Sequence, residues 1–236
     1  LVSTELGLPG IPSAAEDVMV ARNVSLAELT GARLHLAHIS TAGSVRMVRE
    51  AKSRGLKVTA EACPHHFTLT EELTRGYNTH AKMNPPLRTM QDVQAIKEGL
   101  RDGTIDVIAT DHAPHATQEK QQEFTEAPFG IVGLETALSL TLALVDEGVL
   151  TLESAVDKLA TAPAKAFSLN AGTLAVGAPA DVAIVDPNRE WQVDPSRFRS
   201  KSRNTPFAGW KVKGRVTTTI VSGRVVFELD RSERQA

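Results

Sequence analysis

Apolar residues recur with a helical period in the first part of the chain, which predicts an amphipathic helix over residues 14–30. Ser13 and Glu16 precede it at the spacing of a capping box, in which each side chain can satisfy a backbone amide at the helix start. Gly31 follows the last apolar position and predicts the end of the helix. The apolar face consists of Val20, Val24 and Ala27.

Short apolar runs then alternate with further helical patterns. Strands are predicted over residues 33–39, 57–62 and 106–110, and helices over 41–54, 90–100 and 130–145. Strands that alternate with helices of this length form parallel βαβ units, so the pattern predicts an α/β fold. It is either a doubly wound sheet or part of an eight-stranded barrel, because three strands cannot close a barrel alone.

The pattern of residue types changes after Pro163. Short β-rich runs follow, in GTLAVGAPADVAIVDP and WKVKGRVTTTIVSGRVVFEL, with Gly214 and Gly223 between strands. This pattern predicts a small antiparallel β module from about residue 170. We therefore expect an α/β domain over residues 1–165 and a β domain over residues 166–236.

The composition favours a globular protein that acts on small molecules. Hydrophobic residues make up 42% of the 236 positions, enough for one large core or two modest ones. The net charge of -2 gives no electrostatic reason to expect a nucleic acid or a membrane as partner. A single cysteine excludes an internal disulfide, and no apolar run is long enough to span a bilayer, so we expect a cytoplasmic protein. The first residue is not methionine and no signal-peptide pattern follows, which favours a fragment of a longer chain.

Two polar residues follow predicted strands at the edge where α/β folds build their sites. His38 ends the first strand, and Asp111 ends the apolar run IDVIAT. An aspartate in this position is costly to bury unpaired, whereas imidazole and carboxylate are normal zinc ligands. We interpret both as candidate metal ligands and Asp111 as the candidate catalytic base. The alternatives are a structural histidine and an aspartate that caps a helix or a loop.

Further candidates lie in the loops. Asn84 precedes two prolines that stiffen the segment KMNPPLR, although asparagine before proline is often only a turn. His115 lies in the turn after Asp111. Phe129 and Gly130 follow a polar run that is either a lid or a solvated loop, and their amides are placed to face an anion at a helix N-terminus.

Cys63, His65 and His66 surround a proline in the segment ACPHHF. One cysteine without a CxxC partner is a weak signal for a metal site. The simpler interpretation is a thiol that packs as a small hydrophobic group, with histidines that line the mouth of the site.

Seven segments occur in order over nearly the whole chain and together resemble the class I dihydroorotases of the amidohydrolase superfamily. The resemblance implies the C-terminal portion of a (β/α)8 barrel with a small composite β-sandwich domain. It also implies zinc-dependent, reversible cyclisation of N-carbamoyl-L-aspartate to L-dihydroorotate in pyrimidine biosynthesis. The segments are HLAHISTAGS, AEACPHHF, KMNPPLR, ATDHAPH, PFGIVGLETAL, GTLAVGAPADVAIVDP and KSRNTPFAGWKVKGRV.

The resemblance also implies roles for individual residues. His38 would bind the second of two zinc ions, and Asp111 would bind the first and accept a proton during hydrolysis. The pyrimidine ring and its carboxylate would be held by Asn84, His115 and the backbone of Phe129 and Gly130. The other zinc ligands of the family would precede Leu1, so tight zinc binding by these residues alone is not expected. The role of Arg88 is left open.

Two alternatives remain at the level of sequence. One is another cyclic amidohydrolase, an allantoinase or a dihydropyrimidinase-like enzyme, against which Asn84 and His115 favour dihydroorotase. The other is a non-catalytic dihydroorotase-like subunit that partners aspartate transcarbamoylase, against which the presence of His38 and Asp111 argues. Open strand edges also favour pairing with another chain, as in a homodimer.

Overall fold

The computed structural model describes residues 1–229, which fall into two compact units. Unit 1 comprises Leu1–Ala137 and Asp194–Ala208, and unit 2 comprises Leu138–Val193 with the described part of Gly209–Ala236. These units divide the chain differently from the domain boundary expected at residue 165, which stays a prediction. Within residues 1–229, the helices are too short or too polar to cross a membrane.

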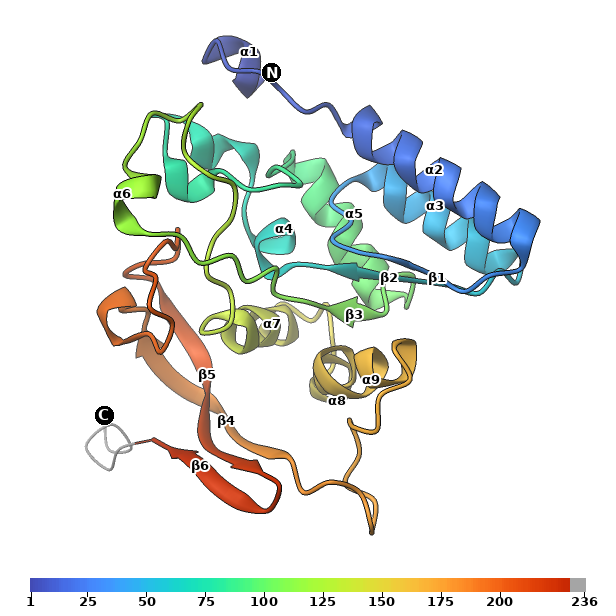
Figure 1. Cartoon of the computed structure of the whole chain (residues 1–236), viewed down its shortest axis with the longest axis vertical. Coiled ribbons are helices and arrows are strands. Elements are labelled where there is room, and N and C mark those ends of the chain that lie inside the picture. Colours follow the sequence, from blue (N-terminus) through green and yellow to red (C-terminus); the bar gives the residue numbers. More distant parts are fainter. Residues whose placement is uncertain (230–236) are drawn as a thin grey trace. The chain divides into compact units, whose positions relative to one another are not determined.

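Unit 1 is built on a parallel sheet of three short strands joined by helices, as the alternating pattern predicts (Figure 1). The strands are, in order across the sheet, β1 (Leu34–Leu36), β2 (Val58–Ala62) and β3 (Val107–Ile108). The main helices are α2 (Ser13–Thr30), α3 (Ala42–Ser53) and α5 (Met90–Arg101), and α3 packs between the other two. Shorter elements are α1 (Val2–Glu5), α4 (Pro64–Thr68), α6 (Thr117–Lys120) and the 3-10 turns η1 (Glu71–Thr74), η2 (Thr79–Ala81) and η4 (Pro195–Arg197).

The core of unit 1 follows from the apolar faces of these helices. Helix α5 begins at a capping box between Thr89 and Asp92, which fixes where its apolar face starts. Its residues and those of α3 then alternate between core and solvent with a helical period. The fully buried side chains on these two helices include Val45, Val48, Ala51, Ile96 and Leu100.

The predicted capping box at the start of α2 is wrong. The helix begins at Ser13 itself, Pro12 takes the N-cap position, and no side chain caps it. Pro12 has a fixed φ near -66° and an extended ψ, so the chain enters the helix one residue earlier than the sequence pattern suggests. Glu16 is therefore released from capping and contacts the loop after β1 instead.

The predicted helix over residues 130–145 begins later than expected, because α7 spans Ala137–Asp146. Gly130 has a φ of 115°, which lies outside the helical region, and Ile131 forms a parallel bridge with His112. The backbone of Gly133 also lies against the carbonyl of Thr110, where a Cβ would be 2.7 Å from the oxygen. The amides of Phe129 and Gly130 are thus not at a helix N-terminus.

Unit 2 contains the antiparallel β module that the sequence predicts, and its sheet has the order β4, β5, β6. Gly214 in this sheet has a φ of 87°, and a Cβ there would lie 2.2 Å from Leu142 Cδ1, so only glycine fits. Its carbonyl accepts hydrogen bonds from Ser139 Oγ at 2.7 Å and Trp191 Nε1 at 3.1 Å, which fixes α7 on the strands. The elements after α7 are α8 (Leu152–Val156), a π-helical turn η3 (Asp157–Thr161), α9 (Ala162–Ala166), β4 (Val182–Gln192), β5 (Lys211–Val221) and β6 (Arg224–Glu228).

Candidate active site

The two candidate metal ligands leave the carboxyl ends of parallel strands in an unusual backbone conformation. His38 follows β1 with a φ of 53°, and Asp111 follows β3 with a φ of 47°. A side chain in this left-handed region costs on the order of 1–3 kcal/mol, and such residues cluster at functional sites because the surrounding fold holds them there. Both residues therefore lie just after the carboxyl ends of their strands in a conformation that the surrounding fold must hold.

The structure brings these two residues together. Nε2 of His38 lies 3.7 Å from Oδ1 of Asp111, and their side chains are 31% and 29% exposed. This distance is longer than a hydrogen bond, so both atoms keep lone pairs in a place that solvent reaches. A nitrogen and a carboxylate oxygen at this separation can supply two ligands to a metal ion.

Glu61, a buried residue of β2, fixes the orientation of the His38 ring. Its Oε1 lies 2.7 Å from His38 Nδ1, and its Oε2 lies 3.0 Å from His35 Nε2. Burial raises the pKa of Glu61, but the hydrogen bonds and charges of the two histidines outweigh it and lower the pKa to about 2. Glu61 was not among the residues predicted from the sequence, although an acid inside the apolar strand VTAEA is a usable signal.

Glu61 also determines which nitrogen of His38 can bind a cation. A carboxylate only accepts, so Nδ1 carries the proton and Nε2 keeps its lone pair toward Asp111. The hydrogen bond to Glu61 raises the pKa of His38, burial opposes this, and the charges of Glu61 and Asp111 raise it further. This pairing of imidazole with a second carboxylate is typical of metal-binding histidines.

Three of the predicted substrate residues lie together in a second cluster. His115 Nε2 donates a hydrogen bond to the carbonyl of Phe129 at 2.8 Å, and the amide of Gly130 donates to the carbonyl of Lys82 at 2.9 Å. A Cβ on Gly130 would lie 2.4 Å from the Cβ of Ala113, so the two loops approach as closely as glycine permits. In the described part of the chain, contacts join these residues but not Asn84, whose side chain is exposed.

Asn204 holds this cluster together from a distant part of the sequence. Its side chain is 2% exposed, and Nδ2 donates to the carbonyls of Ala113 at 2.9 Å and Gly130 at 3.2 Å. Its Oδ1 accepts from the amide of His115 at 3.2 Å. Asn204 was not among the residues predicted from the sequence, because its neighbours in KSRNTPFAG give no local chemical signal.

A buried lysine holds the segment that ends at Gly130. Lys120 is 3% exposed, and its Nζ donates to the carbonyls of Pro128 at 2.8 Å, Gly130 at 3.1 Å and Lys82 at 3.5 Å. Burial, together with the charge of Lys82, lowers the pKa of Lys120 to about 8. The polar run before Phe129 is therefore anchored by an inward-pointing cation, which its polar composition did not reveal.

Lys82 supports the same segment from the opposite side. Its Nζ donates to the carbonyl of Thr125 at 2.8 Å and lies 4.7 Å from the centre of the Phe129 ring. A cation at this distance from an aromatic face is attracted to it. The ring of Phe129 is thereby positioned although it is 47% exposed.

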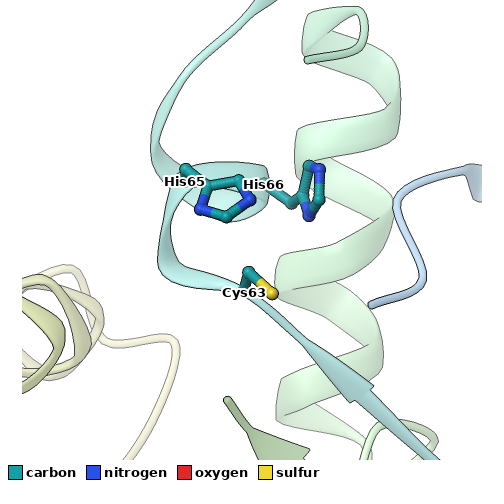
Figure 2. A group of neighbouring side chains, drawn as sticks. All are labelled: Cys63, His65 and His66. Atoms are coloured by element: carbon teal, nitrogen blue, oxygen red, sulfur yellow. The ribbon is translucent and has the colours of Figure 1, made fainter. Parts of the chain in front are cut away.

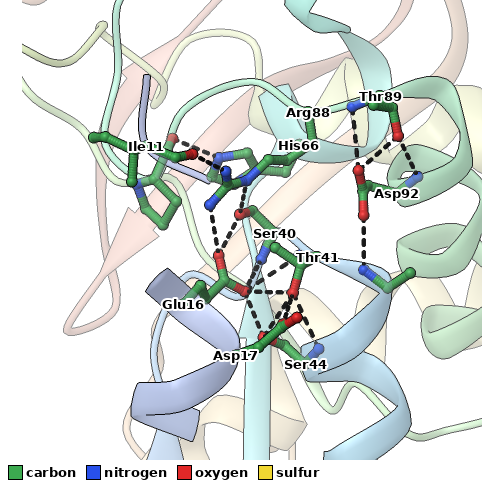
Figure 3. A network of polar contacts seen from close by, with 12 residues as sticks. Ile11, Glu16, Asp17, Ser40, Thr41, Ser44, His66, Arg88, Thr89 and Asp92 are labelled. Atoms are coloured by element: carbon green, nitrogen blue, oxygen red, sulfur yellow. Dashed lines mark hydrogen bonds and ion pairs between the residues drawn. The ribbon is translucent and has the colours of Figure 1, made fainter. Parts of the chain in front are cut away.

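A polar network joins helix α2, the segment after β1 and the loop before α5 (Figure 3). Glu16 accepts from the amides of Ser40 at 2.8 Å and Thr41 at 3.2 Å, and from the hydroxyl of Ser44 at 2.7 Å. Arg88, which is 7% exposed, donates to Ser40 Oγ at 3.1 Å and to the carbonyl of Ile11 at 2.6 Å. Arg88, whose role the sequence left open, thus links the KMNPPLR loop to the segment after His38.

Cys63, His65 and His66 lie beside the site but are buried. Cys63 Sγ is 3.3 Å from His38 Nδ1, and burial raises the pKa of this thiol. The two histidines are 2% and 3% exposed, so they do not line an open mouth as the sequence suggested. The packing of Cys63 as a small hydrophobic group agrees with its complete burial.

Comparisons with known proteins agree with this geometry. A sequence model of the amidohydrolase family matches residues 8–226. The chain is 57% identical to a dihydroorotase of Syntrophus aciditrophicus, over 97% of this chain and 54% of that protein. It is 61% identical to a dihydroorotase of Citrifermentans bemidjiense, over 96% of this chain and 54% of that protein. The chain thus spans about half the length of the curated relatives that it matches.

Solved structures give the same picture of the fold. The structure resembles L-hydantoinase (dihydropyrimidinase) from Arthrobacter aurescens, with a TM-score of 0.87 and 33% identity, over 92% of this chain and 49% of that chain. It resembles dihydropyrimidinase from Brevibacillus agri with a TM-score of 0.86 and 27% identity over the same shares. The prediction of an α/β barrel portion followed by a β module is confirmed.

Proposed function

Because the chain belongs to the amidohydrolase family, we propose that the protein is a dihydroorotase, which interconverts N-carbamoyl-L-aspartate and L-dihydroorotate. The observation that carries this proposal is the approach of His38 Nε2 to Asp111 Oδ1 at the ends of two parallel strands. Dihydroorotases share 57% and 61% identity with the chain, whereas the hydantoinase and dihydropyrimidinase share 33% and 27%. These identities favour dihydroorotate over the ring substrates of the latter enzymes.

The residues present fit zinc as the metal. His38 offers an imidazole nitrogen whose tautomer Glu61 fixes, and Asp111 offers a carboxylate, which are normal zinc ligands. We assign these two residues to a pair of zinc ions, for which further ligands beyond them are required. When bound, zinc acidifies water and polarises the amide carbonyl of the ring.

Asp111 acts as the base in this proposal. In the hydrolytic direction water adds to the ring amide carbon, the carbon–nitrogen bond breaks, Asp111 accepts the proton from water, and the departing nitrogen receives a proton. Glu61 keeps Nδ1 of His38 protonated throughout, so the imidazole remains a lone-pair donor at Nε2. The 29% exposure of Asp111 leaves its carboxylate accessible to the reacting atoms.

The ring and its carboxylate are assigned to Asn84, His115, Phe129 and Gly130. The amide of Gly130 already donates to Lys82, so the part of Gly130 is to let the loop pass close to Ala113. His115 is held by Phe129 and Asn204, which leaves its ring with a fixed orientation toward a ligand. Asn84 lies on an exposed loop, from which its amide can reach a bound ring.

The test is the rate of dihydroorotate hydrolysis by the full-length protein. We expect Asp111→Asn to lower kcat by about 10²- to 10⁴-fold, because it removes the base while keeping the shape of the side chain. Asp146→Asn is the matched control, since Asp146 is an exposed aspartate paired with Lys213. Unchanged turnover in Asp111→Asn would remove this residue from the mechanism.

A second comparison tests the substrate. Dihydroorotate carries a carboxylate that dihydrouracil lacks, so a dihydroorotase should hydrolyse the former and not the latter. Preference for dihydrouracil or allantoin would establish one of the related cyclic amidohydrolases instead. Absence of turnover on all three substrates in zinc-loaded protein would favour a non-catalytic subunit. Pairing with a second copy or with aspartate transcarbamoylase stays a prediction, and size measurements with and without that enzyme would test it.

A further inference from the structure

A second group of metal-binding side chains lies where β2 leads into α4. Figure 2 shows Cys63, His65 and His66 gathered at this junction. One ligand atom from each side chain lies within 4.8 Å of those of the other two. All three residues are buried, with exposures of 0%, 2% and 3%. The group does not include His38 or Asp111, although Cys63 Sγ lies 3.3 Å from His38 Nδ1.

The ring of His66 is arranged as metal-binding histidines commonly are. Nε2 of His66 lies 2.9 Å from the carbonyl oxygen of Pro85. A carbonyl oxygen can only accept, so Nε2 carries the proton and Nδ1 keeps the lone pair. Nδ1 is buried and has no hydrogen-bond partner. A backbone carbonyl that fixes the tautomer and leaves the other nitrogen free is the usual support of a metal-binding imidazole.

The ring of His65 provides a second free nitrogen. Its Nε2 is buried and also lacks a hydrogen-bond partner. A buried polar atom without a partner costs on the order of 1–3 kcal/mol, so two such atoms side by side with a thiol need an explanation. The rings of His65 and His66 are 4.3 Å apart between centroids and meet edge to face at 62°.

We propose that Cys63, His65 and His66 bind a transition-metal ion, of which Zn²⁺ is the ion best suited to one sulfur and two nitrogens. In a tetrahedral zinc site the sulfur and nitrogen ligands lie about 3.5 Å apart. Side-chain movements of about 1 Å would bring the three ligand atoms, which now lie within 4.8 Å of one another, to this spacing. His38, whose Nδ1 lies 3.3 Å from Cys63 Sγ, is 31% exposed. This site goes beyond the proposed function and does not depend on it.

The first test uses Co²⁺ in place of zinc, because a thiolate bound to Co²⁺ gives a near-ultraviolet charge-transfer band. The difference between full-length wild type and Cys63→Ala isolates the band that belongs to this cysteine. We expect the band to be lost in His65→Gln and in His66→Gln. It should persist in His80→Gln, because His80 also has a buried Nδ1 without a hydrogen-bond partner but lies outside the group. It should also persist in Asp111→Asn.

The second measurement needs no variant and therefore no assumption about folding. Wild-type protein loaded with zinc in excess is examined by X-ray absorption at the zinc edge, where a zinc–sulfur distance of about 2.3 Å is expected. The proposal is overturned if no sulfur is found around zinc. It is also overturned if the cobalt band of Cys63→Ala equals that of wild type, or if the band remains in both His65→Gln and His66→Gln. These negative results are expected if ordered water, and not a metal ion, binds the free nitrogens of His65 and His66.

Discussion

Oε1 of Glu61 accepts a hydrogen bond from Nδ1 of His38 at 2.7 Å, so a buried acid sets which ring nitrogen of the candidate ligand keeps its lone pair. Glu61→Gln keeps the shape but allows the amide to donate to the ring, which favours the wrong tautomer. We expect metal affinity or turnover to fall by about 10- to 100-fold. Zinc content and kcat of the full-length protein measure this.

Glu98→Gln is the control for this variant, because Glu98 is an exposed acid on α5 that pairs with Arg101. It should retain both zinc and turnover. Equal behaviour of Glu61→Gln and Glu98→Gln would show that Glu61 does not orient His38.

Lys120→Met tests how the segment ending at Gly130 is held. The variant keeps the length of the side chain but leaves the carbonyl of Pro128 without its donor at 2.8 Å. We expect the free energy of unfolding to fall by about 1–3 kcal/mol. KM for dihydroorotate should rise more than kcat falls, since the loop binds and does not react. Lys57→Met, at an exposed lysine, is the control, and a change in kcat alone would contradict the assigned role.

The same lysine predicts a pH dependence of stability. Burial lowers the pKa of Lys120 from 10.5 to about 8 in the folded protein, so the unfolded chain binds more protons between these values. Its contribution to the free energy of unfolding therefore rises with pH across this window. Denaturant unfolding at about pH 7 and about pH 10 should show wild type gaining stability relative to Lys120→Met. A constant difference would mean that Lys120 titrates as an exposed lysine does.

Gly130→Ala tests the close approach of two loops. The new Cβ would lie 2.4 Å from that of Ala113, at a backbone φ of 115°. Gly103 is a matched control, because its φ of 79° is also positive but a Cβ there meets nothing within 4 Å. We expect Gly130→Ala to lose about 1–3 kcal/mol more stability than Gly103→Ala, measured by denaturant unfolding. Similar losses would show that the loops separate easily.

The sequence predicted the elements whose signals are local. The apolar periods of α2 and α5 and the glycine at the end of α2, Gly31, gave the correct helices, because these signals come from nearby residues. The start of α7 was wrong because the contact of Gly133 with Thr110 is not local. The pattern of apolar positions contains no information on such an approach.

The residues of the candidate site also divide into those that the sequence predicted and those that it did not. His38 and Asp111 were found because a polar residue after an apolar strand is visible in the sequence, and the structure places them 3.7 Å apart. Their catalytic and metal-binding roles stay predictions. Lys120 and Asn204 were missed because their partners are backbone carbonyls, which every residue possesses. Residues 230–236 of the predicted β domain lie outside the described residues.

The hydrogen bonds of Asn204 impose an order on the synthesis of this protein. Translation proceeds from the N-terminus, so the carbonyls of Ala113 and Gly130 emerge long before the side chain that joins them. Residues 138–193, which belong to the other compact unit, must be made in between. The loops around His115 therefore cannot complete their hydrogen bonds to Asn204 until this residue has been synthesised. A gene divided at residue 193 would separate this clamp from the loops it closes.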